Sequence, residues 1–487
     1  MRDKSSFSGW NRNINYRRRN QQIVHYMSTP NIVWITLDSL RSDHTTIGGY
    51  ERDTTPEMAD IADSGHGFDT CIAHGKSTLP STGAILTGYA PTHTNIGIEG
   101  NAVPDGITTV AERFRDAGYR TACLSRNSYV SSATNLDRGF DRFQWLASST
   151  IHRAGAKTLA SYLWNIRSHS AGLTTDTAKH ASPLLMNGVA KRWLGDFESE
   201  SEPFFFYLHY NEPHRPYYPP GKYLDTFTDD LEMSGREAAK RALEIHYSLD
   251  EIVANGCDLT DEEWAALRAM YDAEIAYTDE MVGRLVSHLR SLDLGDTVVV
   301  VTGDHGELFG EWGLLSHSYV LNDAVTRVPL VINGLDESLT VDDSDIIQHS
   351  DVMRTLLEVA GVDGSDTIGV DLREEGREFA VSQRGPNTYE ELLTHNPDFD
   401  YSAFHTGTLN ALRTEEWRYQ ESGEGAELFD LADQETDVRE AYPEVAESLQ
   451  SDLTDWVEAN GQPVSEGQQE EFSGTVQRQL RDLGYME

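Results

Sequence analysis

The segment NIVWITLD (residues 31–38) decides the fold class of this 487-residue chain. It is a short apolar run, rich in β-branched residues, and it ends in Asp38. Such a run is typical of a buried parallel strand with a carboxylate at its carboxyl end. The run DTVVVVTGDHGE (296–307) has the same character and ends in Asp304 and His305. The pattern predicts a sheet with a site at its carboxyl edge.

Strands and helices alternate on either side of these two runs. EPFFFYLHY (202–210) and VPLVINGL (328–335) have the composition of buried strands. Helical patterns occupy 54–65 and 260–292, and 106–125 fits a helix followed by a strand. We therefore expect an α/β fold, with helices on both faces of a mostly parallel sheet.

Four regions differ in composition. Residues 1–27 are basic, with six Lys or Arg and one Asp before Met27, and are predicted to be a disordered N-terminal extension. Residues 28–374 form the predicted main domain. From 375 to 460 the pattern changes to short strands and one helix, which predicts a small α+β subdomain with an antiparallel sheet. Residues 461–487 are predicted to be an acidic, polar tail.

The charge of the chain is strongly negative. It carries 80 Asp and Glu against 39 Lys and Arg, a net charge of −41, and the acids are spread along its length. A diffuse acidic excess is typical of a protein surface in high salt, because salt screens the repulsion between the acidic side chains. The pattern therefore predicts a cytoplasmic protein of a halophile. An ordinary acidic protein is the alternative. With no basic face to meet phosphates, nucleic acid is excluded as a partner.

Two further counts bear on the environment of the protein. Three cysteines without CxxC spacing fit a reducing compartment. No apolar run approaches the roughly 20 residues of a membrane-spanning helix, so no transmembrane segment is predicted. The sequence leaves the oligomeric state open.

Polar residues suited to metal binding and catalysis recur where strands end or helices begin. STLPSTGAILTG (77–88) offers three hydroxyls, those of Ser77, Thr78 and Ser81. The other candidates, in chain order, are Asp38, His209, His214, Asp304, His305 and His317. Carboxylates, imidazole and a hydroxyl form a mixed oxygen and nitrogen site for a divalent cation. Such a cation would activate a bound hydroxyl as a nucleophile and hold an anionic ester.

Several motifs, in order, resemble the sulfatase family of the alkaline phosphatase superfamily. They are NIVWITLDSLRSDH, TTPEMADIADSG, STLPSTGAILTGYAPTHTNIG, AERFRDAGYRT, DRGFD, TGDHGELFGEWGLLSH, TRVPLVI, LRTEEWRYQ and AELFDLADQETD. The resemblance covers most of residues 31–460. It implies an alkaline-phosphatase-like α/β/α sandwich with a small C-terminal subdomain.

The resemblance also implies roles for individual residues. Aligning Pro80 with the proline of the family's Cys/Ser-x-Pro-x-Arg signature places the nucleophile at Thr78. It implies one divalent ion, which is calcium, magnesium or manganese, with zinc permitted by the imidazole. The implied ligands of this ion are Asp38, Asp304, His305 and Thr78 itself. His214 and His317 match residues that contact the anion and protonate the leaving oxygen. Arg126 and His209 are candidates for binding the substrate, a small-molecule, glycan-linked or lipid-linked anionic ester.

Departures from the signature shift the expected chemistry toward phosphorus. Sulfatases oxidise Cys or Ser to formylglycine, and threonine cannot give that aldehyde. The signature Arg is Thr82, and the second Asp of the first strand is Ser39. The remaining pattern resembles lipoteichoic acid synthases and phosphoethanolamine transferases, which use a metal-bound threonine. We therefore expect cleavage of a phosphoester through Thr78. The alternatives are a conventional arylsulfatase and a metal-binding scaffold without activity.

Overall fold

The computed structural model describes residues 29–147, 149–171, 179–335 and 339–464, together with residues 472, 474, 476 and 477. The predicted N-terminal extension, 1–27, and most of the predicted tail, 461–487, lie outside these residues.

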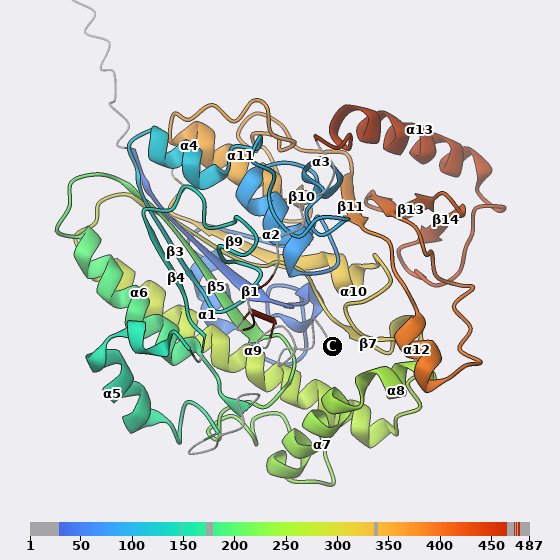
Figure 1. Ribbon diagram of the computed structural model, residues 1–487, viewed down its shortest axis with the longest axis horizontal. Coiled ribbons are helices and arrows are strands. Elements are labelled where there is room, and N and C mark those ends of the chain that lie inside the picture. Colours follow the sequence, from blue (N-terminus) through green and yellow to red (C-terminus); the bar gives the residue numbers. More distant parts are fainter. Residues whose placement is uncertain are drawn as a thin grey trace, which may run out of the picture.

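One large sheet forms the centre of the described structure (Figure 1). Its eight strands, in spatial order, are β10 (Ile347–Gln348), β2 (His66–Ile72), β9 (Arg327–Asn333), β6 (Thr297–Gly303), β1 (Asn31–Asp38), β5 (Phe204–Pro213), β3 (Arg120–Ser125) and β4 (Arg142–Trp145). Every pairing is parallel except those of β9, which runs antiparallel to both β2 and β6. The central segment NIVWITLD is buried along its whole length, as expected for a strand covered on both faces.

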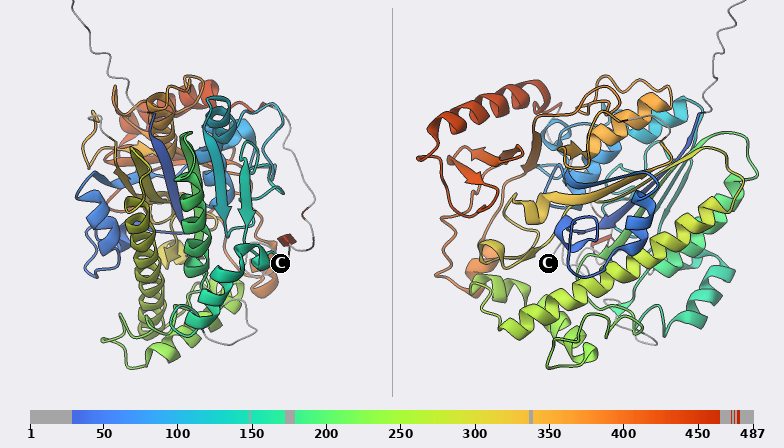
Figure 2. Two further views of the ribbon diagram at one scale, coloured as in Figure 1. Left: turned by 90° about the vertical axis from the view of Figure 1, so that its left-hand side faces the viewer. Right: turned by 180° about the vertical axis from the view of Figure 1, so that it is seen from behind.

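Helices cover both faces, as the alternation predicted. Val33, Ile35 and Leu37 of β1 belong to a core that includes side chains of α1 (Pro56–Ala62), α6 (Pro183–Phe197), α7 (Gly235–Tyr247) and α9 (Asp261–Arg290). The alternate residues Ile32 and Trp34 belong to a second core with α2 (Thr78–Thr87), α4 (Val110–Asp116) and α11 (His349–Val359). Because successive side chains of a strand point to opposite faces, one strand joins both cores. Figures 1 and 2 show the two helical layers with the sheet between them.

The predicted C-terminal antiparallel sheet is present. It has the order β11 (Ala380–Arg384), β12 (Leu409–Arg413), β13 (Trp417–Ser422) and β14 (Gly425–Asp430), and α13 (Pro443–Asn460) packs on it. Its first strand meets the main body through several hydrogen bonds, and two of them reach the segment before α2: Gln383 N donates to His74 O, and Ser382 Oγ donates to Ala73 O. The sheet therefore supports the loop that leads into Thr78.

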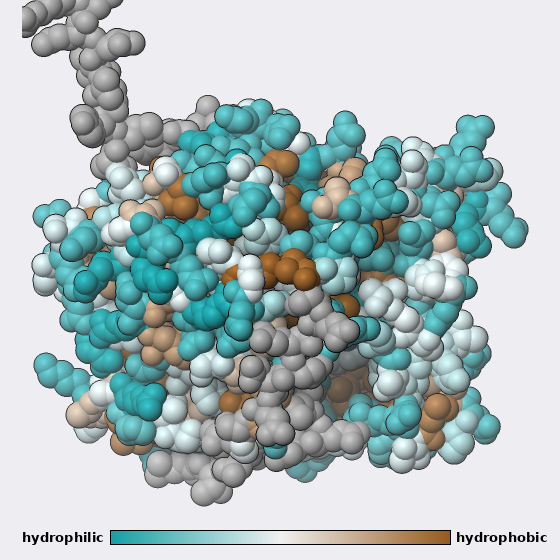
Figure 3. Space-filling model, turned by 45° about the horizontal axis from the view of Figure 1, so that its top comes forward, coloured by the Kyte–Doolittle hydropathy of each residue, from teal (hydrophilic) through white to brown (hydrophobic). Residues whose placement is uncertain are grey.

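Shorter elements complete the chain. The helices among them are α3 (Pro91–Thr94), α5 (Ala156–Asn165), α8 (Leu249–Ala254), α10 (Asp323–Thr326) and α12 (Glu390–His395), and the two-residue strands β7 (Leu308–Phe309) and β8 (Leu315–Ser316) pair with each other. The face seen in Figure 3 is mostly hydrophilic, with small separate apolar groups. In the part of the chain that the structure describes, no helix is long and apolar enough to cross a bilayer.

Candidate active site

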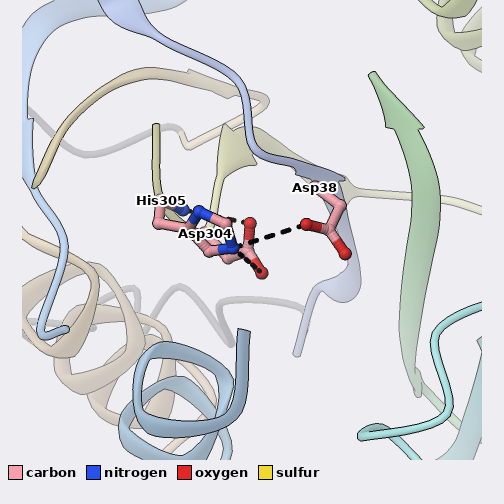
Figure 4. Close-up of side chains that lie close together, drawn as sticks. All are labelled: Asp38, Asp304 and His305. Atoms are coloured by element: carbon pink, nitrogen blue, oxygen red, sulfur yellow. Dashed lines mark hydrogen bonds and ion pairs between the residues drawn. The ribbon is translucent and has the colours of Figure 1, made fainter. Parts of the chain in front are cut away.

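The pairing of two strands brings the acidic residues of the site together. β1 and β6 are parallel, and Leu37 is paired with Gly303. The next residue of each chain segment, Asp38 and Asp304, therefore leaves the sheet at the same edge. His305 follows at once, and Figure 4 shows the three side chains converging. The prediction that two strand ends bring Asp38, Asp304 and His305 together is confirmed.

These three side chains have the spacing of metal ligands. One ligand atom from each of Asp38, Asp304 and His305 lies within 4.8 Å of the others. His305 Nε2 is 3.4 Å from Asp38 Oδ1 and 3.9 Å from Asp304 Oδ2. The other ring nitrogen, Nδ1, is 2.8 Å from Gly306 O and donates to it, so Nε2 is the nitrogen that faces the carboxylates.

The charge balance of this cluster fits a bound cation. Asp304 Oδ1 accepts hydrogen bonds from two backbone N–H groups, but Asp304 Oδ2 is buried and has no hydrogen-bond partner. Burial, together with the negative charge of Asp38, raises the pKa of Asp304. The same carboxylates, against the effect of burial, raise the pKa of His305 to about 9. Two buried carboxylates and one imidazole match the oxygen and nitrogen donors that divalent ions accept.

Thr78 lies at the first position of α2 and faces the cluster. Its Oγ1 is 3.3 Å from Asp38 Oδ2 and 3.4 Å from His305 Nε2. The side chain is completely buried. The beginning of a helix carries partial positive charge, so it favours an alkoxide or a bound anion at this position.

The other two hydroxyls of the 77–88 segment are placed differently. Ser81 Oγ donates to Gly75 O at 3.0 Å and is thereby directed at the backbone. Ser77 is the N-cap residue of α2 and its side chain makes no capping hydrogen bond. Thr78 is thus the hydroxyl of the three that contacts the carboxylates.

Two predicted histidines border the same space. The ring of His317 is 4.5 Å, between centroids, from that of His305 and 5.2 Å from that of His214. Burial lowers the pKa of His214 to about 3 and, with the charge of His305, lowers the pKa of His317 well below its usual range. His317 Nδ1 lies 3.3 Å from Glu307 Oε1, so Glu307 orients the ring.

The two candidates for substrate binding occupy different places. His209, on β5, is fully buried, and its Nε2 lies 3.3 Å from Asp38 Oδ2. The Arg126 guanidinium donates to Leu146 O at 2.9 Å. Burial raises the pKa of Glu212, and the nearby charge of Arg126 opposes that rise. A contact of either residue with substrate remains a prediction.

Sequence reasoning missed two residues at the site. Asn127 Nδ2 donates to Asp38 Oδ2 at 2.6 Å and to Thr78 Oγ1 at 3.3 Å. It follows β3, so the rule that flagged Asp38 and Asp304, a polar residue just past a strand, would have found it. Lys76 is half-buried, and its positive charge contributes to the low pKa of His317. Because the signature Arg is Thr82 here, Lys76 supplies a cation that the motif lacks.

Comparison with known proteins decides the family. The family model described as Sulfatase matches residues 30–362, which is more than half of the chain. The chain belongs to the sulfatase family. Arylsulfatase K of Bos taurus is 26% identical over 467 residues, covering 90% of this chain and 83% of the relative. An arylsulfatase of Clostridium perfringens is 24% identical over 385 residues, covering 71% of this chain and 78% of the relative.

Solved structures show the same fold. The phosphonate monoester hydrolase of Agrobacterium radiobacter superposes with a TM-score of 0.67 at 21% identity, covering 88% of this chain and 95% of that one. The predicted alkaline-phosphatase-like α/β fold is therefore confirmed. Family membership and the metal-ligand cluster make the protein a sulfatase-family ester hydrolase.

Proposed function

We propose that this sulfatase-family protein cleaves a phosphoester through Thr78, with one divalent ion held by Asp38, Asp304 and His305. The observation that carries the proposal is the position of the Thr78 hydroxyl, 3.3 Å from Asp38 Oδ2 at the beginning of a helix. An oxidised cysteine or serine is absent from this position, so the threonine oxygen itself is the nucleophile. When bound, the ion lowers the pKa of that hydroxyl and offsets the charge of the ester.

The residues around Thr78 are arranged for attack. Asp38 Oδ2 is close enough to accept the proton of the hydroxyl. Asn127 donates to both Asp38 and Thr78, and so fixes their relative orientation. The Thr78 oxygen then attacks phosphorus in line with the departing oxygen, and a phosphothreonine forms.

His317 and His214 transfer protons in the two half-reactions. Burial raises the pKa of Glu307 and lowers that of His317, so this pair shares one proton at 3.3 Å that His317 can pass to the leaving oxygen. His214 Nδ1 donates to Arg215 O at 2.7 Å, which leaves Nε2 as the acceptor nitrogen of the neutral ring. His214 can therefore take the proton of the water or alcohol that releases the phosphate. Lys76 balances the charge of the anion.

Sulfate ester hydrolysis is the second candidate. It is favoured by the arylsulfatase relatives, which match along as much as 90% of this chain. The substrate is, in either case, a small-molecule, glycan-linked or lipid-linked anionic ester. The spread of acidic residues supports a cytoplasm of high salt as the working environment.

The test compares an aryl phosphodiester with an aryl sulfate, using protein loaded with Mn²⁺ in buffered KCl. We expect faster turnover of the phosphodiester, loss of at least about a thousandfold in kcat for Thr78→Ala, and labelled phosphate trapped on Thr78 of the wild type. Ser81→Ala is the matched control, because its hydroxyl is directed at the backbone, and it should stay active.

The other outcomes of this test would each lead to a different conclusion about the function. Faster turnover of the aryl sulfate, lost in Thr78→Ala, would contradict the preference for phosphorus and favour the second candidate. Turnover that survives in Thr78→Ala would exclude this residue as the nucleophile. Binding of Mn²⁺ without turnover of either ester would favour a scaffold without activity.

A further inference from the structure

One stretch of this acidic chain is nearly free of acid. Residues 142–195 contain seven Lys or Arg and a single Asp. At the chain's average of 80 acidic residues in 487, a stretch of this length would carry about nine. The segment includes β4, α5 and most of α6. This basic island departs from the expectation, drawn from the net charge of −41, that the chain has no basic face.

Several cations of this island lack acidic partners. Arg153, Lys157 and Arg167 are exposed, and none forms an ion pair with another described residue. By contrast, Arg142 of the same stretch bonds to Asp196 at 2.7 Å. Unpaired cations on a protein with a twofold excess of acid are charges that remain available to a partner.

Exposed apolar side chains occur in the same place. Trp164 is 90% exposed and Leu163 is 61% exposed, both on α5. Tyr162, between the helix and the core, is buried. Lys157 lies two turns before Trp164 and so shares its side of the helix. In Figure 1, α5 lies at the edge of the molecule, outside α6.

We propose that α5, with Leu163, Trp164 and the cations Arg153, Lys157 and Arg167, docks the protein on an anionic lipid membrane. Tryptophan favours the interface between headgroups and acyl chains, and cations beside it pair with anionic headgroups. An exposed leucine gains nothing from a sugar ring or a nucleic-acid phosphate, whereas it gains from insertion among acyl chains. The net negative charge of the rest of the surface is screened beyond about 8 Å at 0.15 M salt and beyond about 3 Å at 1 M salt.

Arg167, one of the cations of the proposed docking surface, also lines a cavity. It has a volume of about 440 Å³, and Arg167 and Arg236 contribute to its lining together with Tyr218. Neither arginine forms an ion pair with another described residue. Tyr218 lies four residues after His214, so an anionic headgroup held between the two arginines would sit beside the loop that carries this histidine.

Sedimentation with lipid vesicles tests the proposal on the full-length protein. We expect binding to phosphatidylcholine vesicles that contain phosphatidylglycerol, and much weaker binding to phosphatidylcholine alone. The triple variant Arg153→Gln, Lys157→Gln, Arg167→Gln should bind about a hundredfold more weakly, since each cation contributes roughly fivefold. The double variant Leu163→Ser, Trp164→Ser should also lose most binding, and Trp164→Phe should remove the blue shift of tryptophan emission that vesicles cause.

The control variant changes a comparable pair of residues on another helix. Lys240→Gln with Tyr247→Ser alters an exposed cation and a 64% exposed aromatic residue of α7, and it should bind vesicles like the wild type. All these side chains are exposed, so thermal unfolding of each variant should match that of the wild type. Equal binding to both kinds of vesicle, wild-type binding by the α5 variants, or capture by dextran sulfate in preference to vesicles would each overturn the proposal.

Discussion

Two fully buried aspartates, Asp272 and Asp304, show how differently this chain treats a charge without access to water. Asp272, in the middle of α9, accepts from His44 Nδ1 at 2.7 Å, from the Tyr50 hydroxyl at 2.9 Å and from Arg52 at 2.7 Å. Among the described residues, Asp304 has only backbone donors at Oδ1, none at Oδ2, and a second carboxylate, Asp38, as its neighbour.

The difference separates a structural carboxylate from a functional one. Burying a charge is costly unless a partner compensates it. The partners of Asp272 belong to the chain, and they include an arginine. Asp38 accepts from Asn127, but among the described residues Asp304 Oδ2 has no hydrogen-bond donor, and a bound cation would compensate it. The unsatisfied oxygen therefore distinguishes the active site more clearly than burial or charge alone.

The largest expected contrast is in catalysis. Asp304→Asn should lower kcat on the preferred ester by a thousandfold or more, on the order of the loss seen when a principal catalytic group is removed. Asp272→Asn should keep the turnover of its folded molecules close to that of the wild type, because the partners of Asp272 in the described part of the chain are His44, Tyr50 and Arg52 rather than the site residues. Steady-state assays on both variants, corrected for the folded fraction, measure this. Equal losses of kcat in the two variants would contradict the distinction between a functional Asp304 and a structural Asp272.

For the free energy of unfolding, Asp272→Asn should have the larger effect of the two variants. Asp272→Asn leaves Arg52 beside a neutral group. Breaking a fully buried ion pair costs about 3–5 kcal/mol, and because Arg52 is partly exposed we expect about 2–3 kcal/mol. Denaturant unfolding of the metal-free protein should show a loss of this size. A loss below about 1 kcal/mol would mean that the pairs of Asp272 are dispensable.

A third buried group, His349, makes the stability of the fold depend on pH. His349 donates through Nε2 to Gly303 O at 2.9 Å, and burial lowers its pKa to about 4. The unfolded chain takes up this proton near pH 6.5 and the folded chain does not. Stability should therefore fall as the pH drops from 6.5 to 4, by about 3 kcal/mol for this one group.

His349→Gln isolates that contribution, because glutamine keeps a donor for Gly303 O and cannot be protonated. The stability of this variant should vary less with pH than that of the wild type across the same range. Unfolding free energies at several pH values test the difference. Parallel curves for the two proteins would show that His349 is not the group responsible.

The smallest expected effect has the opposite sign from that of Asp272→Asn. In metal-free protein, Asp304→Asn removes one of two repelling buried carboxylates, and stability should be unchanged or higher by about 1 kcal/mol. Thermal unfolding in the presence of a chelator measures it. Destabilisation of several kcal/mol would indicate that Asp304, like Asp272, is held by the chain itself.

The strand ends were predictable and most of the site followed from them. NIVWITLD and DTVVVVTG are buried strands because their composition leaves no other place for them, and parallel pairing then brings Asp38 and Asp304 together. The motif pointed to Thr78, and the structure places its hydroxyl beside Asp38. The antiparallel C-terminal sheet followed from short alternating segments with turn residues between them.

Other features depend on contacts that no local pattern records. Asp272 looks like any charged residue of a long helix, and its burial results from the packing of His44, Tyr50 and Arg52 around it. The segments 150–200 and 221–260 are polar and weakly periodic, yet they contain α5, α6, α7 and α8. Their helices are stabilised by packing rather than by a pattern of their own: α6 packs on β5 and α9, α7 on α9, α5 on α6, and α8 on α7 and α12.

The most direct test of the account is the stoichiometry of metal binding. Titration of the metal-free protein with Mn²⁺ at pH 8 should show one ion per wild-type chain, one per Asp272→Asn chain that remains folded, and none, at the same concentrations, for Asp304→Asn. Unchanged affinity in Asp304→Asn, or loss of the ion in Asp272→Asn, would contradict the claim that Asp304, with its unsatisfied Oδ2, forms the metal site together with Asp38 and His305.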